Sequence, residues 1–509
     1  MDFVLDNLLT LILFSPLVGM AVVLLLPSDE EKLVRWVALL FSLVPLALSL
    51  VLWIEYDIGV PGYQFVEKVI WYGPINASYH VGVDGISVSM ILLTTILSPL
   101  AILASHGIKD RIKMYMALFL LLEVGMLGVF MALDLIIFFV FWEVGLVPMY
   151  FLINQWGSAN RRYASIKFIL YTMAGSLGLL LSIQVIGLSA GTFDLVELTR
   201  LWPTLSGPIL GISAATVKAV AFWAFVIAFA IKVPIWPFHT WLPDAHTEAP
   251  TAGSMILAGV LLKLGAYGFI RLVLPLFPEQ AASAAAVLGL LGVLSVIFGA
   301  YASYGQTDFK RLIAYSSVNH MGFVVMGIAV AAYVGGISPT EELATSSIIA
   351  LNGAVLQMFN HGLSAAALFF LVGVIYERTH TRDLNSYGGL WAAMPAYGGI
   401  LIFCAMASVG LPGLNGFVSE FMVVRGVWGV YKIYTALSMI GLLLTGAYLL
   451  KALKLVLHGP LNPEWKGIAE ISTRERIVVF PLMALMLSIG LWPRWVLEVI
   501  NATVTRLIG

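Results

Sequence analysis

The feature that most constrains this chain is a series of long apolar runs that recurs from one end to the other. A helix needs about 20 apolar residues to cross the roughly 30 Å hydrocarbon layer of a membrane, and the sequence offers about fourteen such windows. Two shorter apolar pieces, near 236–245 and 415–430, are interpreted as halves of broken spans. The predicted fold is therefore an all-α membrane protein. The windows lie near 5–27, 33–54, 84–104, 113–132, 135–154, 163–189, 212–232, 249–274, 281–303, 311–333, 345–376, 391–411, 432–457 and 477–496.

Composition excludes several other classes. Only 11% of the residues are Asp, Glu, Lys or Arg, whereas a soluble domain carries roughly 25%, so most of the surface cannot face water. The net charge of −1 leaves no basic excess to neutralise the phosphates of a nucleic acid. Cys404 is the single cysteine, and an iron–sulfur cluster needs about four, so a redox cofactor bound through cysteine is expected in a partner.

The connections between the windows differ in basic residues. Even-numbered connections hold little beyond Lys68, Arg200 and Lys432. Because cytoplasmic loops are enriched in Lys and Arg, the odd-numbered connections are predicted to be cytoplasmic. Both termini then lie on the outer side, as an even number of spans requires. The odd-numbered connections carry Lys32 and Arg35; Lys109, Arg111 and Lys113; Arg161, Arg162 and Lys167; Lys310 and Arg311; Arg378 and Arg382; and Lys466, Arg474 and Arg476.

Two segments outside this pattern need a separate interpretation. The first apolar run follows Asp2 and Asp6 with no Lys or Arg before Lys32. Secretory signal peptides begin with a basic segment, so this run is expected to be a membrane span. The longest polar connection, 55–83, is rich in Gly, Tyr and Trp and is expected to form a turn-rich external cap.

Ionisable residues inside the apolar windows indicate function. Each costs about 2.5–3.5 kcal/mol on insertion scales, so such residues are uncommon without a role. Acids, amines and imidazoles at membrane depth can pass a proton along, because each accepts and releases one. The alternative is a set of satisfied ion pairs and hydrogen bonds that fix helix packing. These residues are Glu123, Glu143, Lys232, Lys263, His320, His361 and Glu420.

Two of these charges lie beside helix breaks. Lys232 precedes Val233-Pro234 and Pro237, so its helix must end there, where the negative end of the dipole favours a cation. Glu420 follows the interruption at 410–416 and is expected in the first turn of the restarted helix, where a carboxylate is favoured. Charges at interrupted helices are typical of transporter sites; a purely structural proline kink is the alternative.

The two breaks fall in the seventh and twelfth windows, five apart. A repeat of five spans inserts its second copy upside down, so spans 4–8 and 9–13 are predicted to form inverted repeats, each with a broken helix. The expected divisions are 1–112 (spans 1–3), 113–275 (first repeat), 276–458 (second repeat) and 459–509 (span 14).

The stretch WPFHTWLPDAHTEAPTAGS follows the first break. Its His239 and His246 are seven residues apart, which would place them on one face of a helix. Two roles are favoured over a metal site. One is a hydrated proton route, and the other is capping of the break and of the next helix by Thr247 and Glu248.

At this stretch the sequence resembles a known family. KVPIWPFHTWLPDAHTEAPTAGSMILAGVLLKLGAYG is similar to the signature of the antiporter-like membrane proteins, which include the large membrane subunits of respiratory complex I and related cation/proton antiporter subunits. FWEVGLVPMYFLI, SSVNHMGF, FNHGLSAAALFFLVG and LPGLNGFVSEF extend the resemblance over nearly the whole chain. VGVDGISVSMILLTT, ERTHTRDLNSYGGL and a glutamate at position 420 favour the subunit M (chain 4) branch.

The resemblance implies a proton-translocating subunit of NADH:quinone oxidoreductase. Glu143 and Lys232 would form the first half-channel pair, Lys263 the central relay, His320 and His361 its continuation, and Glu420 the outlet. Glu123, His239 and His246 are possible additional members. The chain itself would bind no redox cofactor and no metal. FMN, iron–sulfur clusters and quinone are expected in partner subunits, beside homologous antiporter-like subunits and lipid, in the bacterial inner membrane in preference to the mitochondrial one.

Two other functions fit the same residues less well. One is a cation/proton antiporter subunit that is not driven by electron transfer; Glu420 favours complex I, through the family comparison alone. The other is a haem carrier that uses His320 and His361 as axial ligands. The lysines and glutamates along the proposed path would be costly beside a haem in an apolar pocket.

Overall fold

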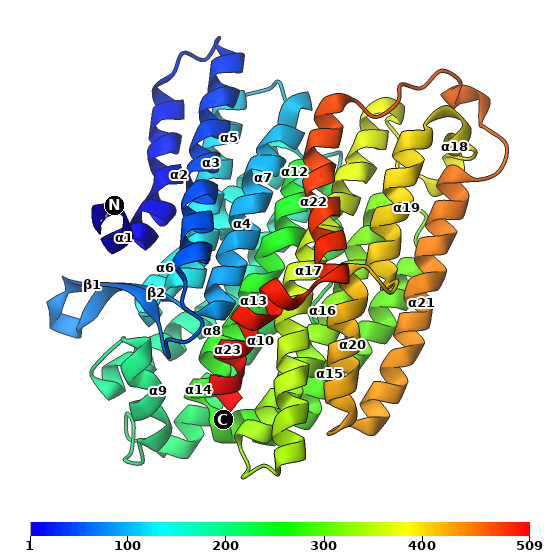
Figure 1. The fold of residues 1–509 in the computed structure, drawn as a ribbon. Helices are drawn as coiled ribbons and strands as arrows, with labels where there is room; N and C mark the ends of the chain where they lie inside the picture. Colours follow the sequence, from blue (N-terminus) through cyan, green and yellow to red (C-terminus); the bar gives the residue numbers. More distant parts are fainter. Residues whose placement is uncertain (1, 509) are drawn as a thin grey trace.

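The computed structural model describes residues 2–508, and the side chains from Val4 onward. Most of its long helices run nearly parallel; the N-terminal end lies on the left of Figure 1 at about mid-height, and the C-terminal end lies near the bottom. The N-terminal third of the chain contains helices α1 to α5 and a β-hairpin. Their bounds are α1 Asp2–Asp6, α2 Leu8–Leu25, α3 Glu31–Glu55, β1 Gln64–Tyr72, η1 Gly73–Ile75, β2 Ala77–Val83, α4 Gly85–Ala104, η2 Ser105–Gly107 and α5 Ile112–Met131.

The middle of the chain is helical and contains two π-helical segments, η3 and η4. These segments interrupt the helix that begins at Thr251 and ends at Leu276. The bounds are α6 Leu135–Val144, α7 Leu146–Trp156, α8 Arg161–Ala190, α9 Leu195–Thr204, α10 Ala214–Lys232, α11 Trp241–Glu248, α12 Thr251–Ile256, η3 Leu257–Leu261, α13 Leu262–Gly268, η4 Phe269–Val273, α14 Leu274–Leu276 and α15 Pro278–Tyr304.

The last third begins with two long helices and ends with a bent pair. Helix α22 turns by 70° into α23, which crosses the lower part of the molecule obliquely (Figure 1). The bounds are α16 Phe309–Gly335, α17 Glu341–Thr379, η5 Leu384–Ser386, α18 Leu390–Ala393, α19 Pro395–Val409, α20 Asn415–Trp428, α21 Lys432–Leu457, η6 Pro463–Trp465, α22 Thr473–Leu491 and α23 Arg494–Ile508.

The all-α multi-pass fold is confirmed. Among the described residues, 12 helices are long and apolar enough to cross a membrane, or 13 when α22 and α23 count as one bent span. The predicted twelfth span does not enter that number, because its two pieces, α19 and α20, have only 15 and 14 residues. The total of fourteen spans therefore stays a prediction.

The spans differ sharply in burial. The apolar windows of Thr251–Leu276 and α17 are wholly buried, whereas those of α2 and α3 are 39% and 33% buried. Each of these two helices carries a buried ionisable residue, Lys263 and His361 respectively. Outer helices therefore shield a polar centre from lipid, as the cost of charge in hydrocarbon requires.

Small residues allow close helix contacts, for example between α15 and α16. A methyl group added at Gly299 would lie 2.6 Å from the backbone nitrogen of Asn319, and one at Gly322 would lie 2.7 Å from the carbonyl oxygen of Gly292. Glycine at these positions lets the two backbones touch, which is a common means of helix association in membranes.

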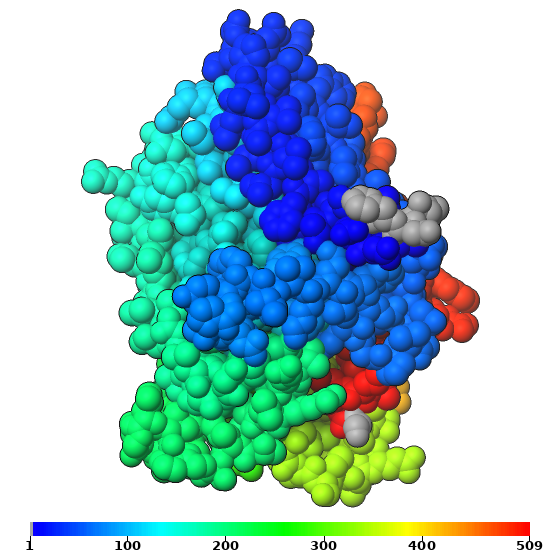
Figure 2. Space-filling view, turned by 90° about the vertical axis from the view of Figure 1, so that its left-hand side faces the viewer, coloured from blue at the N-terminus to red at the C-terminus, as the bar shows by residue number. Residues whose placement is uncertain are grey.

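The connection 55–83 is more regular than expected. It contains an antiparallel hairpin of β1 and β2, in which Lys68 pairs with His80 and Ile70 with Ser78. The prediction of a turn-rich cap was therefore wrong in detail, because the β-branched and aromatic residues in QFVEKVIWY favour a strand. The chain around the hairpin forms a light-blue band across the face shown in Figure 2.

Candidate functional site

The first broken helix is formed as the sequence predicts. Helix α10 ends at Lys232, and α11 resumes at Trp241. Two side-chain bonds hold the intervening turn: the Trp241 indole donates to the carbonyl oxygen of Ile231 at 2.8 Å, and the Trp236 amide donates to the Ser295 hydroxyl at 2.9 Å. Lys232 therefore lies at a helix C-terminus inside the membrane region, where the dipole favours its charge.

Glu143 and Lys232 do not form the predicted ion pair in this structure. No oxygen of Glu143 lies within 4.0 Å of the Lys232 amine, although the two groups are within electrostatic range. The Lys232 amine instead lies 5.0 Å from the centre of the Trp142 ring, and Oε1 of Glu143 is buried with no hydrogen-bond partner in residues 2–508. The structure thus shows the separated arrangement of this pair.

Lys263 lies at the centre, on α13 between the two π-helical segments. Its side chain is completely buried. The amine donates to the carbonyl oxygen of Ala258 in η3 and lies 2.8 Å from Nδ1 of His361. A π-segment leaves carbonyl groups outside the regular α-helical ladder, which explains how an amine five residues later can use one.

A buried series of polar side chains continues from His361. Its Nε2 lies 3.2 Å from the Ser317 hydroxyl, and its ring centre lies 5.6 Å from that of His320. His320 in turn contacts Ser408 through Nε2 at 3.0 Å and Glu420 through Nδ1 at 2.7 Å. Lys263, His361, His320 and Glu420 thus form one row, interrupted only between the two imidazoles, where a hydroxyl or a water is needed to bridge.

The second broken helix presents Glu420, although not as predicted. Helix α19 ends at Val409 and α20 begins at Asn415, so the break is confirmed. Glu420 is the sixth residue of α20 and lies in the second turn, so the prediction of a first-turn position was wrong. The dipole acts mainly within the first turn; hydrogen bonds from His320 and Gln357 hold this carboxylate instead.

A shell of amides and hydroxyls surrounds the Glu420 end of the row. The Gln357 amide donates to Oε1 of Glu420 at 3.0 Å, and the Ser419 hydroxyl donates back to Gln357. The Asn360 amide donates to Ser419 at 2.9 Å and to the carbonyl oxygen of Asn415 at 2.7 Å. These residues were not predicted from the sequence, because an isolated Gln, Asn or Ser in an apolar window gives no indication of its partner.

The three possible additional residues do not join this row by hydrogen bonds. Both carboxylate oxygens of Glu123 are buried without a hydrogen-bond partner in the described chain. His246 is completely buried and stacks on Phe369, with ring centres 4.5 Å apart and no bond to either ring nitrogen among residues 2–508. His239 is half-buried, and its Nδ1 is likewise unbonded within the described part.

A pocket of about 470 Å³ lies at the end that carries the odd-numbered connections, lined among others by Lys109, Ala249 and Arg382. Lys310 lines this pocket and donates to the carbonyl oxygen of Ala249. Lys310 was predicted as a loop residue, but it is the second residue of α16 and only 6% exposed. Lys310 and Lys263 both lie within electrostatic range of His246.

The ring nitrogens of His320 and His361 are fully used. Each of the four lies within hydrogen-bond distance of a side chain. An axial haem ligand needs a free nitrogen, so this arrangement does not fit the haem alternative. No cluster of three or more His, Cys, Asp or Glu within residues 2–508 could hold a metal ion.

Comparison with known proteins agrees with this geometry. Residues 132–446 match the family described as NADH:quinone oxidoreductase/Mrp antiporter, transmembrane. The chain belongs to this family. NADH-quinone oxidoreductase subunit M of Rhodobacter capsulatus is 42% identical, over 99% of this chain and 96% of the relative. NAD(P)H-quinone oxidoreductase chain 4 1 of Nostoc sp. is 40% identical, over 97% of this chain and 90% of the relative.

Solved structures of the family have the same fold. A chain of respiratory complex I from Thermus thermophilus matches with a TM-score of 0.85 and 27% identity, over 98% of this chain and all of the other. A chain of the Mrp complex from Dietzia sp. matches with a TM-score of 0.84, over 99% and 98% of the two chains. At 20% identity, the second match shows the fold alone.

One buried ion pair of this family member was missed from the sequence. Arg271 in η4 lies 2.7 Å from Asp84, and its guanidinium stacks 4.9 Å from the Tyr63 ring. Tyr267, on the same helix as Lys263, lies 5.9 Å from the guanidinium and bonds to Ser87. An arginine near the end of an apolar window was a signal in the sequence from which this ion pair could have been predicted. The pair anchors the helix that carries Lys263.

Proposed function

We propose that this chain is the proton-translocating membrane subunit of an NADH:quinone oxidoreductase. The observation that carries the proposal is the buried row Lys263, His361, His320 and Glu420. Each member accepts and releases a proton, and neighbouring members lie 2.7–2.8 Å apart except at the imidazole pair. Relatives whose names include NADH-quinone oxidoreductase subunit M, at 42% identity over almost the full length, support the electron-driven function over an independent antiporter.

The role of each residue follows from its place. Glu143 and Lys232 load the row, and the approach of Glu143 favours the charged amine because opposite charges attract in a low-dielectric interior. Lys263 receives the proton and passes it to His361 and His320. Glu420 releases it at the far end. The reductive chemistry that drives these steps belongs to partner subunits, which hold FMN, iron–sulfur clusters and quinone.

The proposal extends to the arrangement of the chain. The two breaks, α10–α11 and α19–α20, support the inverted repeats 113–275 and 276–458, flanked by 1–112 and 459–509. The basic odd-numbered connections support a cytoplasmic location for that end, with both termini periplasmic in a bacterial inner membrane. Homologous antiporter-like subunits would pack against this chain, as the complex I match supports.

The test is Lys263→Gln in the complete enzyme complex, reconstituted in vesicles. We expect proton pumping and coupled quinone reduction to fall by about 100-fold or more, the contribution typical of a positioned proton-transfer group. Oxidation of NADH by an artificial acceptor should persist, because that chemistry lies elsewhere.

Lys451→Gln is the matched control. Lys451 also lies on a membrane helix and donates to backbone carbonyls, of Tyr304 at 2.6 Å and of Gln306 at 3.3 Å, but it lies outside the row. Normal pumping by an assembled Lys263→Gln complex would refute the proposal. Proton transport coupled to Na⁺ or K⁺, without any electron donor, would favour the antiporter function.

A further inference from the structure

A second pocket lies at the end of the molecule that carries the odd-numbered connections. It has a volume of about 270 Å³ and is formed by the first turns of α3, the end of α4 with η2, and the start of α22. Both α3 and α22 begin at the top of Figure 1. The pocket is lined by Lys32, Arg35, Trp36, Leu39, Ile102, Leu103, His106 and Arg474.

The polar lining of this basic pocket carries one sign of charge. Lys32, His106 and Arg474 form no hydrogen bond or ion pair with any described residue, and no carboxylate lines the pocket. Arg35 donates to the carbonyl oxygens of Ser105 and Ile108, with Glu31 as its nearest acidic neighbour on the same helix. These bonds fix the guanidinium but do not neutralise it.

The cations of the basic pocket act on one another. Arg474 lies within electrostatic range of Arg35. Lys32 and Arg474 are each the second residue of their helix, where the positive end of the dipole disfavours a cation and favours an anion. Mutual repulsion and two helix ends therefore make a bound anion favourable here.

An exposed apolar stripe continues from the pocket along α3. Trp36 is 69% exposed at the pocket, and Leu40, Leu43, Leu50 and Ile54 are 59%, 41%, 48% and 77% exposed. Their spacing of three, four or seven residues puts them on one helix face. A soluble anion would need no such stripe, whereas the acyl chains of a lipid held at the pocket would cover it.

We propose that the basic pocket binds the phosphate group of an anionic phospholipid, with its acyl chains along the exposed face of α3. Basic pockets between transmembrane helices on the cytoplasmic side are suited to such head groups. The Trp36 indole lies between the charged rim and the stripe. An aromatic ring is favoured there, at the boundary between the lipid head group and its acyl chains.

The test is photo-crosslinking of the assembled complex in lipid nanodiscs. Photoactivatable phosphatidylglycerol should label peptides that span residues 31–43, and photoactivatable phosphatidylcholine should label them much less. Lys32→Gln and Arg474→Gln should each reduce the labelling about fivefold, which corresponds to about 1 kcal/mol for one basic residue near the membrane surface. Arg474→Lys keeps the charge and should keep most of the labelling.

Arg162→Gln is the matched control, because Arg162 is also the exposed second residue of a helix, α8, but lies outside the pocket. It should leave the labelling unchanged. Equal labelling in Arg474→Gln and the intact protein would overturn the proposal. Loss of labelling on addition of inorganic phosphate alone, or a crosslink from Arg474 to a carboxylate of a partner subunit, would assign the pocket to a different occupant and also overturn it.

Discussion

The two broken helices have the same layout but differ in how well their charged side chains are hydrogen-bonded. At the first break, Lys232 has only an aromatic ring beside it, and Oε1 of Glu143 is unbonded within the described chain. At the second, His320 uses both ring nitrogens, and one oxygen of Glu420 accepts from two side chains. Breaking a buried pair by removing one partner costs about 3–5 kcal/mol, so the second site is held in place while the first is free to rearrange.

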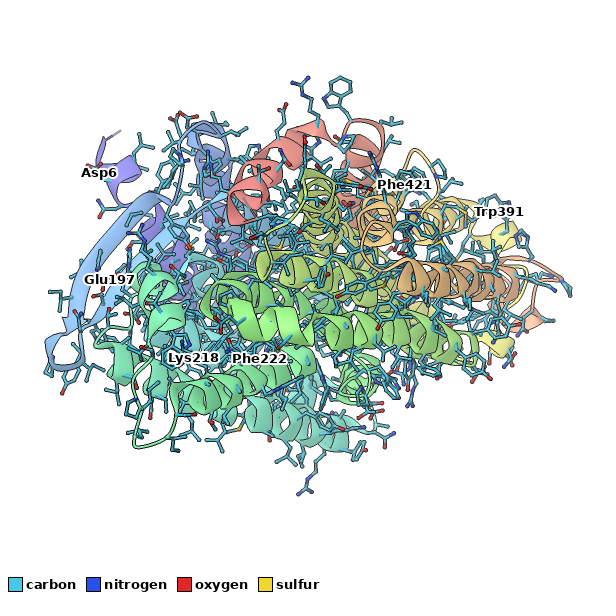
Figure 3. The ribbon with its side chains drawn as sticks, turned by 90° about the horizontal axis from the view of Figure 1, so that it is seen from below. Asp6, Glu197, Lys218, Phe222, Trp391 and Phe421 are labelled. Atoms are coloured by element: carbon cyan, nitrogen blue, oxygen red, sulfur yellow. The ribbon has the colours of Figure 1, made fainter. Side chains whose placement is uncertain are left out.

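This difference assigns separate tasks to the two halves. A charge at the first break can move without the loss of a hydrogen bond, so this half is suited to respond to a partner subunit. The second half holds its groups at bonding distance and is suited to conduct. The view from below (Figure 3) shows an elongated molecule, with Asp6 and Glu197 at one end and Trp391 at the other.

The largest effect is expected from a substitution of Glu420. Glu420→Lys places a cation beside His320 and Gln357 in a site where Glu420 is only 4% exposed. We expect a cost of about 3–5 kcal/mol from the lost pair, seen as a large loss of assembled complex and of pumping. The amount of complex in membranes and the proton uptake of vesicles measure the two effects.

Glu420→Gln serves as the control for this change. The amide keeps the size of the side chain and can still bond to His320, so assembly should be nearly normal. Pumping should nevertheless fall, because the titratable group is gone. Normal pumping by Glu420→Lys would show that this residue has no role in proton release.

Substitutions at the first break should have the opposite result, with loss of pumping but little loss of assembled complex. Glu143→Ala and Lys232→Ala break no hydrogen bond seen in the structure, so each should destabilise the protein less than Glu420→Lys does, by an amount set mainly by the cavity that it leaves. Each should still reduce proton pumping and coupled quinone reduction by about 100-fold. NADH oxidation by an artificial acceptor should persist, and the amount of assembled complex should stay close to normal.

Glu143→Asp sharpens this expectation. It keeps the charge but shortens the reach by one methylene, so partial activity should remain. Full pumping by an assembled Glu143→Ala complex would leave Glu143 with a packing role and refute the loading step.

A smaller effect is expected at the contact between α10 and α13, the helices that carry Lys232 and Lys263. A methyl group at Gly265 would lie 2.9 Å from the carbonyl oxygen of Phe229 and 3.0 Å from Cβ of Lys232. Gly265→Ala should therefore push α13 away from the end of α10, at a cost of about 1–3 kcal/mol for overpacking. A lower thermal midpoint of the complex, with slower pumping, would report it.

Gly446→Ala is the control, since a methyl group there has no neighbour within 4 Å. Its midpoint should equal or exceed that of the intact protein. A Gly265→Ala complex with an unchanged midpoint would show that the spacing of α10 and α13 is not set at this position.

The smallest effect concerns the hairpin outside the spans. Asp194 lies 2.7 Å from Lys68 and 2.9 Å from His80. Burial opposes ionisation of Asp194, but the bonds to His80 and Lys68 outweigh it and hold the pKa of Asp194 below its usual value. The stabilisation is therefore complete above the unfolded-state pKa, about 3.9, and is lost as the pH falls below it.

Hydrogen exchange of the hairpin amides measures this effect. Protection should be equal at pH 5 and pH 7 and fall below pH 4. Asp194→Asn should lower protection at neutral pH by about 1 kcal/mol or less, because Lys68 is 44% exposed on its side chain. Unchanged protection down to pH 2 would contradict the assignment.

The helical framework was predictable because it rests on local signals. Apolar windows of spanning length gave the spans, and prolines after Lys232 gave the first break. The hairpin was missed because a short segment of β-branched and aromatic residues gives a weaker signal than a 20-residue apolar run. The π-segments around Lys263 were also missed, because LLKLGAYG has the composition of an ordinary α-helix.

The site was predictable as a set of residues but not as a geometry. A lysine or glutamate in an apolar window stands out by its cost. Its hydrogen-bond partner cannot be identified in this way, because the partners are distant in sequence. Lys263 and His361 are 98 positions apart, and His320 and Glu420 are 100 apart. The separation of Glu143 from Lys232 depends on side-chain rotamers, which no spacing encodes. The partners of Glu420 likewise follow from packing between α16, α17 and α20.

The complete burial of Thr251–Leu276 and α17 has a consequence for biogenesis. Helices are made in sequence order, so the span that carries Lys263 enters the membrane before α16 and α17 exist. Until those helices arrive, its amine has neither His361 nor a protein interior around it. The newly made chain must therefore keep this span beside the insertion machinery or an assembly factor, and pulse-labelled chains truncated before residue 309 should be degraded faster than chains that extend beyond residue 379.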